Sequence, residues 1–456
     1  MTHGHARSTG DATLDAMLAG AWINPETGLK AERIPFDDIR IEDTLDGAEA
    51  DLVAGVGLSG RIAVVSDPRT HDALGARVVK ALRSLGTVDD VVIDNDEATT
   101  DAVADVTERT RHAEVCVAVG SGTLQDLVKY ATFRDGRRFA TFATAASMNG
   151  YTSVTASITS PEGFKQSLPA HTPAGVFMDI GVIAAAPPFL ARAGLGDCLC
   201  RSTAQVDWRL SARLFGTPYF EVPFILQRDD ERDLLDRAAG VGTGDRAAIR
   251  VLLRLLTWTG LGTCFTGTSH HGSMSEHLVS HWIDMFAGDA HPGTLHGHQV
   301  GYAAVAMSRL QHCVLDADAP PILDATRIDE ADMRARYGAA LGSWCAGEFR
   351  AKALNAGEAA RVNSEMAADW DAFRAPLRDV LLPTQMLVDA LEAAGGYVTA
   401  ASSGLPDGVW RDAILHAREI RNRFSILDIA ADSGLLEEFA ESESFGVSDI
   451  KRRALS

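Results

Sequence analysis

The stretch Val115-Cys-Val-Ala-Val-Gly120-Ser-Gly-Thr-Leu-Gln-Asp126 decides the fold class of this chain. Its first five residues are apolar and β-prone, which predicts a buried strand, and a helix is predicted from Leu124. Gly120, Ser121 and Gly122 form the turn between them, where backbone amides at the start of the helix can approach the pyrophosphate of a dinucleotide. The stretch matches neither the GxGxxG fingerprint nor a Walker A loop, and tight strand-to-helix turns also use glycine for conformational reasons alone.

Short β-rich runs and amphipathic stretches alternate on both sides of this turn. Strands are predicted at 61–67, 91–93 and 139–143, helices at 71–85, 98–111 and 124–133, and further edge strands within 32–49. After about residue 184 the β pattern ends, and helical periodicity follows at 247–258, 275–286, 300–315, 330–346, 356–371, 385–394, 409–423 and 425–439. We therefore predict an α/β nucleotide-binding domain with a parallel sheet over residues 1–183. An all-helical metal and substrate domain is predicted over 184–456, with the active site in the cleft between the two domains.

The composition is that of an ordinary globular protein. The chain has 456 residues, of which 46% are hydrophobic and 23% charged, so two domains are expected and a mostly disordered chain is excluded. Its 42 basic and 62 acidic residues give a net charge of −20, which does not suit a nucleic-acid or anionic-membrane partner. Residues 1–10 lack the apolar core of a secretory signal, the apolar run at 174–186 is interrupted by Asp179, and six cysteines are too few for a disulfide framework. We expect a cytoplasmic protein without membrane insertion.

A group of metal-binding residue types lies in the helical half. His277 and His281 are four residues apart, so they share one face of the predicted helix 275–286. His296 begins the next helix, and Asp197 stands in the unusual setting Gly194-Leu-Gly-Asp197. One carboxylate and two imidazoles with an open position are typical of a catalytic Zn, Fe or Ni site. The alternative for any single histidine is a packed or surface residue, but seven of the 14 histidines fall between residues 270 and 298.

An acidic residue follows the first predicted strand. Asp67 stands where a dinucleotide-binding fold places an acid against the adenosine ribose, and an acid there favours NAD over NADP because it repels a 2′-phosphate. The alternative is that Asp67-Pro68 only starts a turn and caps a helix.

Seven short motifs carry a family resemblance. In chain order they are Gly120-Ser-Gly-Thr-Leu-Gln-Asp126, Thr144-Ala-Ala-Ser-Met-Asn-Gly-Tyr-Thr-Ser153, Gly163-Phe-Lys165, Ala193-Gly-Leu-Gly-Asp197, Asp207-Trp208, Ser275-Glu-His277 and Ala413-Ile-Leu-His-Ala-Arg-Glu-Ile-Arg-Asn-Arg-Phe424. Their order and spacing resemble the sn-glycerol-1-phosphate dehydrogenases, which belong with the glycerol dehydrogenases, iron-type alcohol dehydrogenases and dehydroquinate synthases. The resemblance covers most of residues 30–440.

The resemblance implies a role for individual residues. One divalent metal (Zn, Ni or Fe) would be held by Asp197, His277 and His296, and His281, which is usually not a ligand, could relay a proton. The residues implied to bind NAD are Asp67, Gly120, Ser121, Gly122, Thr123, Asp126, Thr144 and Ser147. Those implied on the substrate side are Asn149, Lys165, His171 and His270.

Two positions depart from the family pattern. The family usually has Asp at the position of Asn149, which contacts a polyol substrate, and Ser-Arg-Pro where this chain has Ser269-His270-His271. Both changes alter the charge and the donor geometry of the pocket. The arginine-rich piece at 418–423 is predicted to be a solvated helix face.

The function implied is hydride transfer between NADH and dihydroxyacetone phosphate to give sn-glycerol 1-phosphate, or the reverse, in phospholipid metabolism. The metal would act as a Lewis acid on the ketone oxygen. A homo-oligomer and a small phosphorylated or polyol substrate are expected from the family. Three alternatives stay open: a dehydrogenase of an unphosphorylated polyol such as glycerol, a dehydroquinate synthase-like cyclase, and a non-catalytic NAD-binding protein. Asp197 argues against the cyclase, which usually has Glu there.

Overall fold

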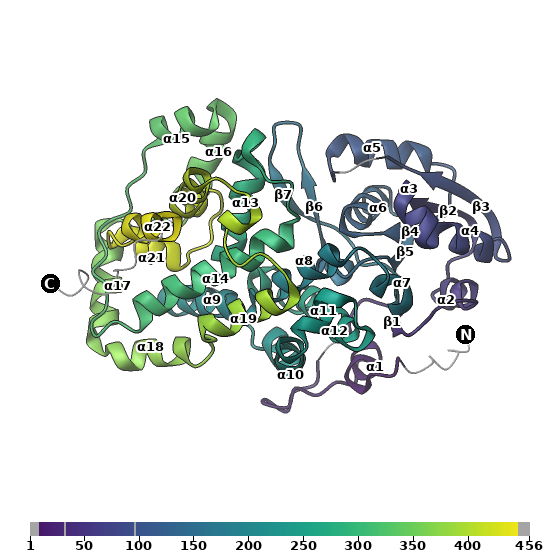
Figure 1. Ribbon diagram of the computed structural model, residues 1–456, viewed down its shortest axis with the longest axis horizontal. Coiled ribbons are helices and arrows are strands. Elements are labelled where there is room, and N and C mark those ends of the chain that lie inside the picture. Colours follow the sequence, from purple (N-terminus) through teal and green to yellow (C-terminus); the bar gives the residue numbers. More distant parts are fainter. Residues whose placement is uncertain (1–8, 32, 95–96, 446–456) are drawn as a thin grey trace. The chain divides into compact units, whose positions relative to one another are not determined.

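The computed structural model describes residues 9–31, 33–94 and 97–445 (Figure 1). The chain forms two compact units, and neither is continuous in sequence. The first contains the chain up to Gly194 together with Ile225–Gly267, and the second contains Leu195–Phe224 and the chain from Thr268 onward. A single boundary between residues 183 and 184 was predicted from the sequence. The structure instead groups the segment 225–267 with the sheet.

The first unit is built on a parallel sheet of six strands. The strands are β1 (Asp38–Glu42), β2 (Gly60–Ser66), β3 (Gly86–Val92), β4 (Val115–Gly120), β5 (Arg138–Ala143) and β8 (Gly175–Asp179), in the spatial order β1-β8-β5-β4-β2-β3. Every pairing in this sheet is parallel, which confirms the predicted fold class. Because β2 pairs with β3 on one side and with β4 on the other, the strand order reverses between β2 and β4. Ligands of such sheets bind beside the carboxyl ends of the strands at this switch point.

Helices cover both faces of the sheet. Against one face lie α5 (Thr100–Arg109) and α6 (Gly122–Asp135), whose apolar side chains pack on Ala63 and Val65 of β2. Against the other lie α2 (Glu49–Gly55) and α4 (Ala76–Leu82), which pack on Ile62 and Val64 of the same strand. A strand covered on both faces is apolar throughout and shows no alternation, as β4 illustrates.

Several elements of the first unit were not predicted. They include the antiparallel hairpin β6 (Thr155–Thr159) and β7 (Lys165–Pro169) and the helices α3 (Pro68–Thr70), α7 (Ile180–Ala184), α10 (Val222–Asp236) and α11 (Ala238–Thr243). Helix α1 (Ala12–Leu18) and the π-helical turn η1 (His71–Gly75) also belong to this unit, and η1 lies within the predicted helix 71–85. Helix α10 begins in the second unit and continues into the first.

One helix is long and apolar enough to cross a membrane by length and composition. It is α12 (Arg246–Thr266), with 21 residues and a mean hydropathy of 1.2 over its most apolar window. No such stretch was predicted from the sequence. However, 78% of that window is buried inside the protein, as it is in a core helix.

The second unit contains helices and no strand among its described residues. The helices are α9 (Arg201–Phe215), α13 (Ser275–Phe286), α14 (His296–Leu315), α15 (Glu330–Tyr337), α16 (Ala339–Arg350), α17 (Ala356–Ala368), α18 (Trp370–Arg378), α19 (Thr384–Ala394), α20 (Asp407–His416), α21 (Ile426–Asp432) and α22 (Leu436–Phe445). The end of α8 (Pro188–Cys198) also belongs to this unit. The predicted helix 330–346 is divided at Gly338 and the predicted helix 425–439 at Gly434, because both glycines have a positive φ (+81° and +77°) that no helix accepts.

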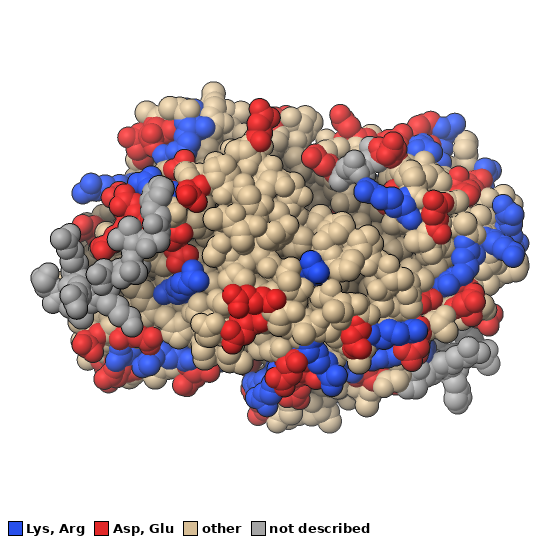
Figure 2. All heavy atoms as spheres, in the orientation of Figure 1, with Lys and Arg blue, Asp and Glu red and all other residues tan. Residues whose placement is uncertain are grey.

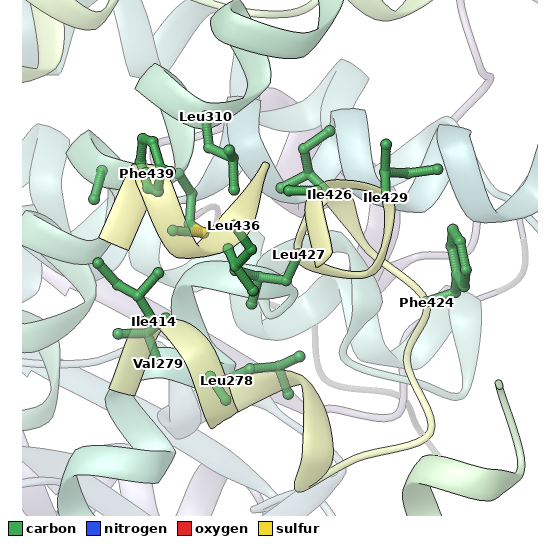
Figure 3. Close-up of a cluster of buried hydrophobic side chains, with 14 of the residues drawn as sticks. Leu278, Val279, Leu310, Ile414, Phe424, Ile426, Leu427, Ile429, Leu436 and Phe439 are labelled. Carbon is green, nitrogen blue, oxygen red and sulfur yellow. The ribbon is translucent and has the colours of Figure 1, made fainter. Parts of the chain in front are cut away.

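The core of the second unit forms where α13 and α14 meet the C-terminal helices. Leu278 and Val279 of α13 and Leu310 of α14 are buried with Leu427 of α21 and Phe439 of α22 (Figure 3). This packing holds α13 and α14, which carry three of the predicted site histidines, in fixed register. On the face shown in Figure 2, acidic and basic side chains are mixed and lie mostly toward the margin, and the middle of this face carries few charged residues.

Candidate metal centre and dinucleotide turn

Three predicted metal ligands come together in the second unit. Asp197 lies near the end of α8, His277 in the first turn of α13, and His296 at the start of α14. One ligand atom from each lies within 4.8 Å of the other two, and Asp197 Oδ1 is 3.4 Å from His277 Nε2. Asp197 and His277 are buried and His296 is half-buried. The donor set and its burial fit one divalent transition metal with a position left for substrate.

Glycines allow the helices carrying these ligands to approach closely. A Cβ placed on Gly196 would lie 2.1 Å from the carbonyl oxygen of Gly297, and one placed on Gly301 would lie 3.0 Å from the Cα of Gly196. A side chain at Gly196 would collide with the backbone of α14, and one at Gly301 would press against the backbone of α8. Because Asp197 follows Gly196 and His296 precedes Gly297, the contact places the carboxylate beside the imidazole.

Glu276 orients His277 from behind. His277 Nδ1 is 3.0 Å from Glu276 Oε1, which also accepts the backbone N–H of Met274 at 2.8 Å, while Oε2 accepts the hydroxyl of Thr203 at 3.1 Å. Burial by itself lowers the pKa of His277, but the hydrogen bonds to Asp197 and Glu276 outweigh burial and raise that pKa to about 9. The two carboxylates therefore favour positive charge at this position, and a bound metal cation would supply it.

His281 lies beside two of these ligands. Its ring centroid is 6.2 Å from that of His277 and 5.2 Å from that of His296. Ligand atoms of His281, Asp284 and His296 also lie within 4.8 Å of one another. The structure thus brings all four predicted catalytic residues into one cluster within the second unit.

The predicted dinucleotide turn joins β4 to α6 in the first unit. A Cβ on Gly120 would lie 2.4 Å from Leu124 Cδ2, and a Cβ on Gly122 would lie 2.7 Å from Met148 Cε, so a larger residue at either position would displace the side chain of Leu124 or Met148. Ser121 is the N-cap of α6, but its side chain makes no capping hydrogen bond. The first amides of α6, including that of Thr123, therefore have no side-chain cap and suit an anionic group.

The loop after β5 is fastened to this turn. The backbone N–H of Thr144 donates to the carbonyl of Gly120 at 3.1 Å, and the Tyr151 hydroxyl lies 3.3 Å from the same carbonyl. Helix α12 holds the far end of the loop, because Thr152 Oγ1 donates to the carbonyl of Thr257 at 2.9 Å. Thr144, which is buried, and Ser147, which is half-buried, are thus placed beside the turn.

Comparison with known proteins shows the family to which this chain belongs. Residues 40–187 match the family model for iron-containing alcohol dehydrogenase. A glycerol-1-phosphate dehydrogenase [NAD(P)+] from Bacillus velezensis is 33% identical over 284 residues, which cover 59% of this chain and 71% of that protein. The enzyme of the same name from Thermococcus kodakarensis is 30% identical over 275 residues, covering 60% of this chain and 77% of that protein. The chain belongs to the glycerol-1-phosphate dehydrogenase family.

The family relationship extends beyond these segments. The glycerol-1-phosphate dehydrogenase [NAD(P)+] from Bacillus licheniformis is 26% identical over 434 residues, covering 93% of this chain and 94% of that protein. Among solved structures, a glycerol dehydrogenase from Schizosaccharomyces pombe superposes with a TM-score of 0.58 at 17% identity, covering 90% of this chain and 91% of that one. A sulfoacetaldehyde reductase from Bifidobacterium kashiwanohense, solved with NAD+, gives 0.58 at 15% identity, covering 91% and 98%. These structures share the fold.

Two residues predicted to bind the cofactor, Asp67 and Asp126, also accept hydrogen bonds from backbone N–H groups of the protein. Asp67 caps α3, where its Oδ1 accepts the N–H groups of Arg69 and Thr70, both at 2.9 Å. Asp67 therefore does cap a helix, as the alternative interpretation of the sequence expected. Both capping hydrogen bonds use Oδ1, so the cap does not occupy Oδ2. Asp126 joins α6 to the hairpin, because its Oδ2 accepts the N–H of Ser157 at 3.1 Å.

The predicted substrate residues are distributed over both units. Asn149 and Lys165 are half-buried in the first unit, in the loop after β5 and at the start of β7. His171 packs on the ring of Phe139, with centroids 5.2 Å apart, and hydrogen-bonds to Thr132 at 2.9 Å. His270 lies in the second unit, in the 3₁₀ turn His270–Gly272, with its ring centroid 5.8 Å from Trp208. Burial, together with the nearby Arg423 and His271, lowers the pKa of His270 to about 3, so its ring is neutral at physiological pH.

The arginines near the C-terminus differ from the prediction of a solvated face. Arg418 is only 6% exposed and donates two hydrogen bonds to Asp432 Oδ1, at 3.0 and 2.9 Å. Arg423 donates to Ser269 Oγ at 2.9 Å and to Ser273 Oγ at 3.0 Å, on either side of His270. The Arg423 guanidinium thus lies beside the segment Ser269-His270-His271, where the family pattern Ser-Arg-Pro has an arginine of its own.

A fully buried lysine beneath the dinucleotide turn was not predicted from the sequence. Lys129 of α6 donates to the carbonyls of Gly150 at 2.6 Å and Thr155 at 3.0 Å and to Ser153 Oγ at 3.2 Å. Its side chain is 0% exposed and lies 3.7 Å from Asp126 Oδ1. The spacing of an acid and a lysine three residues apart on one helix was the available signal.

Proposed function

We propose that this chain catalyses the NAD-dependent interconversion of dihydroxyacetone phosphate and sn-glycerol 1-phosphate. The observation that carries the proposal is the convergence of Asp197, His277 and His296 within 4.8 Å in a member of the glycerol-1-phosphate dehydrogenase family. Family membership makes the chain an NAD(P)-dependent oxidoreductase. NAD is the specific choice because Asp67 would repel a 2′-phosphate.

The residues of the second unit would have three roles at the reacting carbonyl: binding the metal, orienting a ligand and transferring a proton. Asp197, His277 and His296 would hold a divalent metal, and Glu276 would keep the His277 ring in place. When bound, the metal polarises the ketone oxygen and the nicotinamide carries the hydride. His281, beside His277 and His296, would supply a proton from a ring nitrogen to the alkoxide oxygen, since an imidazole is suited to a relay near neutral pH.

The residues of the first unit would bind the cofactor. The uncapped amides after Gly120, Ser121 and Gly122, with Thr123, would accept the pyrophosphate. Thr144 and Ser147 would contact the ribose and nicotinamide side, and Asp126 would support the turn from within α6. Asn149 and Lys165 are proposed on the substrate side.

Arg423 favours a phosphorylated substrate over a plain polyol. A phosphate ester needs a cation or several N–H donors, and a neutral His270 supplies only one hydrogen bond. Arg423, which bonds to Ser269 and Ser273, places a guanidinium beside His270. The competing function, oxidation of an unphosphorylated polyol, is favoured by the departure at Asn149.

The deciding experiment is NADH oxidation by metal-reconstituted protein with dihydroxyacetone phosphate and, in parallel, dihydroxyacetone. Turnover with the phosphate ester alone supports the proposal, and faster turnover with dihydroxyacetone replaces it with the polyol function. His277→Ala should abolish both metal binding and turnover. His312→Ala is the matched control, because His312 lies on α14 sixteen residues beyond His296 and bonds only to Asp316 and the carbonyl of Leu382 among its described contacts.

Three further expectations accompany the proposed function. Elemental analysis of the purified protein should find one Zn, Ni or Fe per chain. Light scattering should find a homo-oligomer, and fractionation of cells should place the protein in the cytoplasm.

A further inference from the structure

A chain of polar side chains extends from the back of His296 into the second unit. His296 Nδ1 is 2.8 Å from Ser280 Oγ, and Ser280 Oγ is 2.8 Å from Gln299 Oε1. The amide nitrogen of Gln299 is in turn 2.9 Å from Asp284 Oδ1. Ser280 and Gln299 are both 0% exposed, so no water competes for these hydrogen bonds.

The direction of each hydrogen bond follows from counting protons, beginning at Asp284. An ionised carboxylate only accepts, so the group of Gln299 that faces Asp284 is its N–H, and the amide oxygen faces Ser280. The serine hydroxyl has one proton, which it donates to that oxygen. Its own oxygen can then only accept from His296, and the proton of the neutral His296 ring must be on Nδ1.

His291 tests the orientation of the Gln299 amide. The backbone N–H of Gly293 donates to His291 Nδ1 at 3.0 Å, so the proton of the neutral His291 ring is on Nε2, which lies 3.2 Å from Asp284 Oδ1 and 2.8 Å from the Gln299 amide nitrogen. A reversed amide would accept from His291, but its oxygen would then lie 2.9 Å from a carboxylate oxygen with no proton between them. With its N–H toward Asp284, the Gln299 amide and His291 Nε2 both donate to Asp284 Oδ1. Their nitrogens lie only 2.8 Å apart, but the charge of the carboxylate attracts both donors and offsets this crowding, so this orientation is the favourable one.

We propose that Asp284 and Gln299 are positioning residues that act through Ser280 to fix the tautomer of His296. With the proton on Nδ1, the lone pair of Nε2 is available as a metal ligand beside Asp197 and His277. The opposite tautomer would present an N–H to the metal and could not coordinate it. This inference rests on the metal centre of the proposed function.

The test measures the affinity of the apoprotein for Zn²⁺ alone, by competition with a chromogenic chelator. Ser280→Ala breaks the chain at its centre and Asp284→Asn removes the group that orients it, so each should weaken Zn²⁺ binding about 10- to 100-fold. Ser308→Ala is the matched control. Ser308 is also 0% exposed in this unit, and its hydroxyl bonds to Thr384 Oγ1 at 2.8 Å, away from His296.

A second readout observes the tautomer directly. In apoprotein labelled with ¹⁵N-histidine, the His296 resonances, assigned by comparison with His296→Ala, should show a protonated Nδ1 in the wild type and in Ser308→Ala. They should show a mixture of tautomers in Ser280→Ala and Asp284→Asn.

The outcomes separate the inference from the proposed function. Unchanged Zn²⁺ affinity and an unchanged His296 tautomer in both variants, with tight binding by the wild type, overturn the positioning role and leave the metal centre intact. Failure of the wild type to bind any divalent metal overturns the metal centre itself.

Discussion

Replacing Gly196 by alanine tests the packing that assembles the metal centre. The new Cβ would lie 2.1 Å from the carbonyl oxygen of Gly297, whereas ordinary contacts begin near 3.4 Å, so α8 and α14 must separate by about 1 Å. Overpacking of this kind costs about 1–3 kcal/mol, partly offset by the better helix propensity of alanine, about 1 kcal/mol. Metal–ligand distances tolerate only about 0.2 Å, so we expect Zn²⁺ affinity to fall at least about tenfold.

The assay combines urea unfolding of the apoprotein with chelator competition for Zn²⁺, and Gly347→Ala is the control. Gly347 is an exposed residue inside α16, and a Cβ added there would meet no neighbouring atom within 4 Å, so alanine should stabilise the protein by about 0.5–1 kcal/mol without changing metal affinity. If Gly196→Ala behaves like Gly347→Ala in both measurements, the close helix crossing does not position the ligands.

Three further predictions concern stability and cofactor binding. Lys129→Met should lower the free energy of unfolding by about 3 kcal/mol and weaken NADH binding, because two buried carbonyls lose their donor; unchanged NADH titrations would contradict this. Glu419→Gln should destabilise the protein by about 2 kcal/mol near neutral pH. Although burial opposes it, bonding to His416, Tyr337 and Arg336 lowers the pKa of Glu419 below 4.5, so this loss should shrink as the pH falls through that lowered pKa and urea unfolding at several pH values measures it. Leu310→Ala, at a 0% exposed core position, should cost about 3 kcal/mol, while Leu29→Ala, 70% exposed, should cost almost nothing in the same assay.

The alternating half of the fold could be predicted because its strands are short, apolar and separated by amphipathic helices. The helices in the region from 185 to 246 could not be predicted, because helices are recognised in a sequence by high helix propensity and by a regular apolar face, and these helices lack one or the other. Helix α8 contains Gly194 and Gly196, which lower helix propensity but permit close packing. Helix α9 buries polar residues such as Gln205 and Asp207 along with apolar ones, so its sequence has no clear polar face.

The candidate site was predictable to the extent that residue type implies chemistry. An aspartate and clustered histidines indicate a metal, and Asp197, His277 and His296 do converge. Glu276 and Gln299 carry no comparable signal, because a glutamate or a glutamine on a helix is usually solvated. Arg423 bonds to Ser273, 150 positions earlier, and no periodicity links residues so far apart.

The division of each unit into separate chain segments has a consequence for synthesis on the ribosome. The loop that carries Thr144 and Ser147 is bonded to α12 at two points. Its Thr152 hydroxyl donates to the carbonyl of Thr257, and the backbone N–H of Val154 donates to Thr263 Oγ1 at 3.0 Å. The nascent chain must therefore emerge past residue 263 before this part of the nucleotide-binding unit can close. By then Asp197 has already left the tunnel, so the sheet unit cannot mature as an independent N-terminal domain ahead of the second unit's first segment.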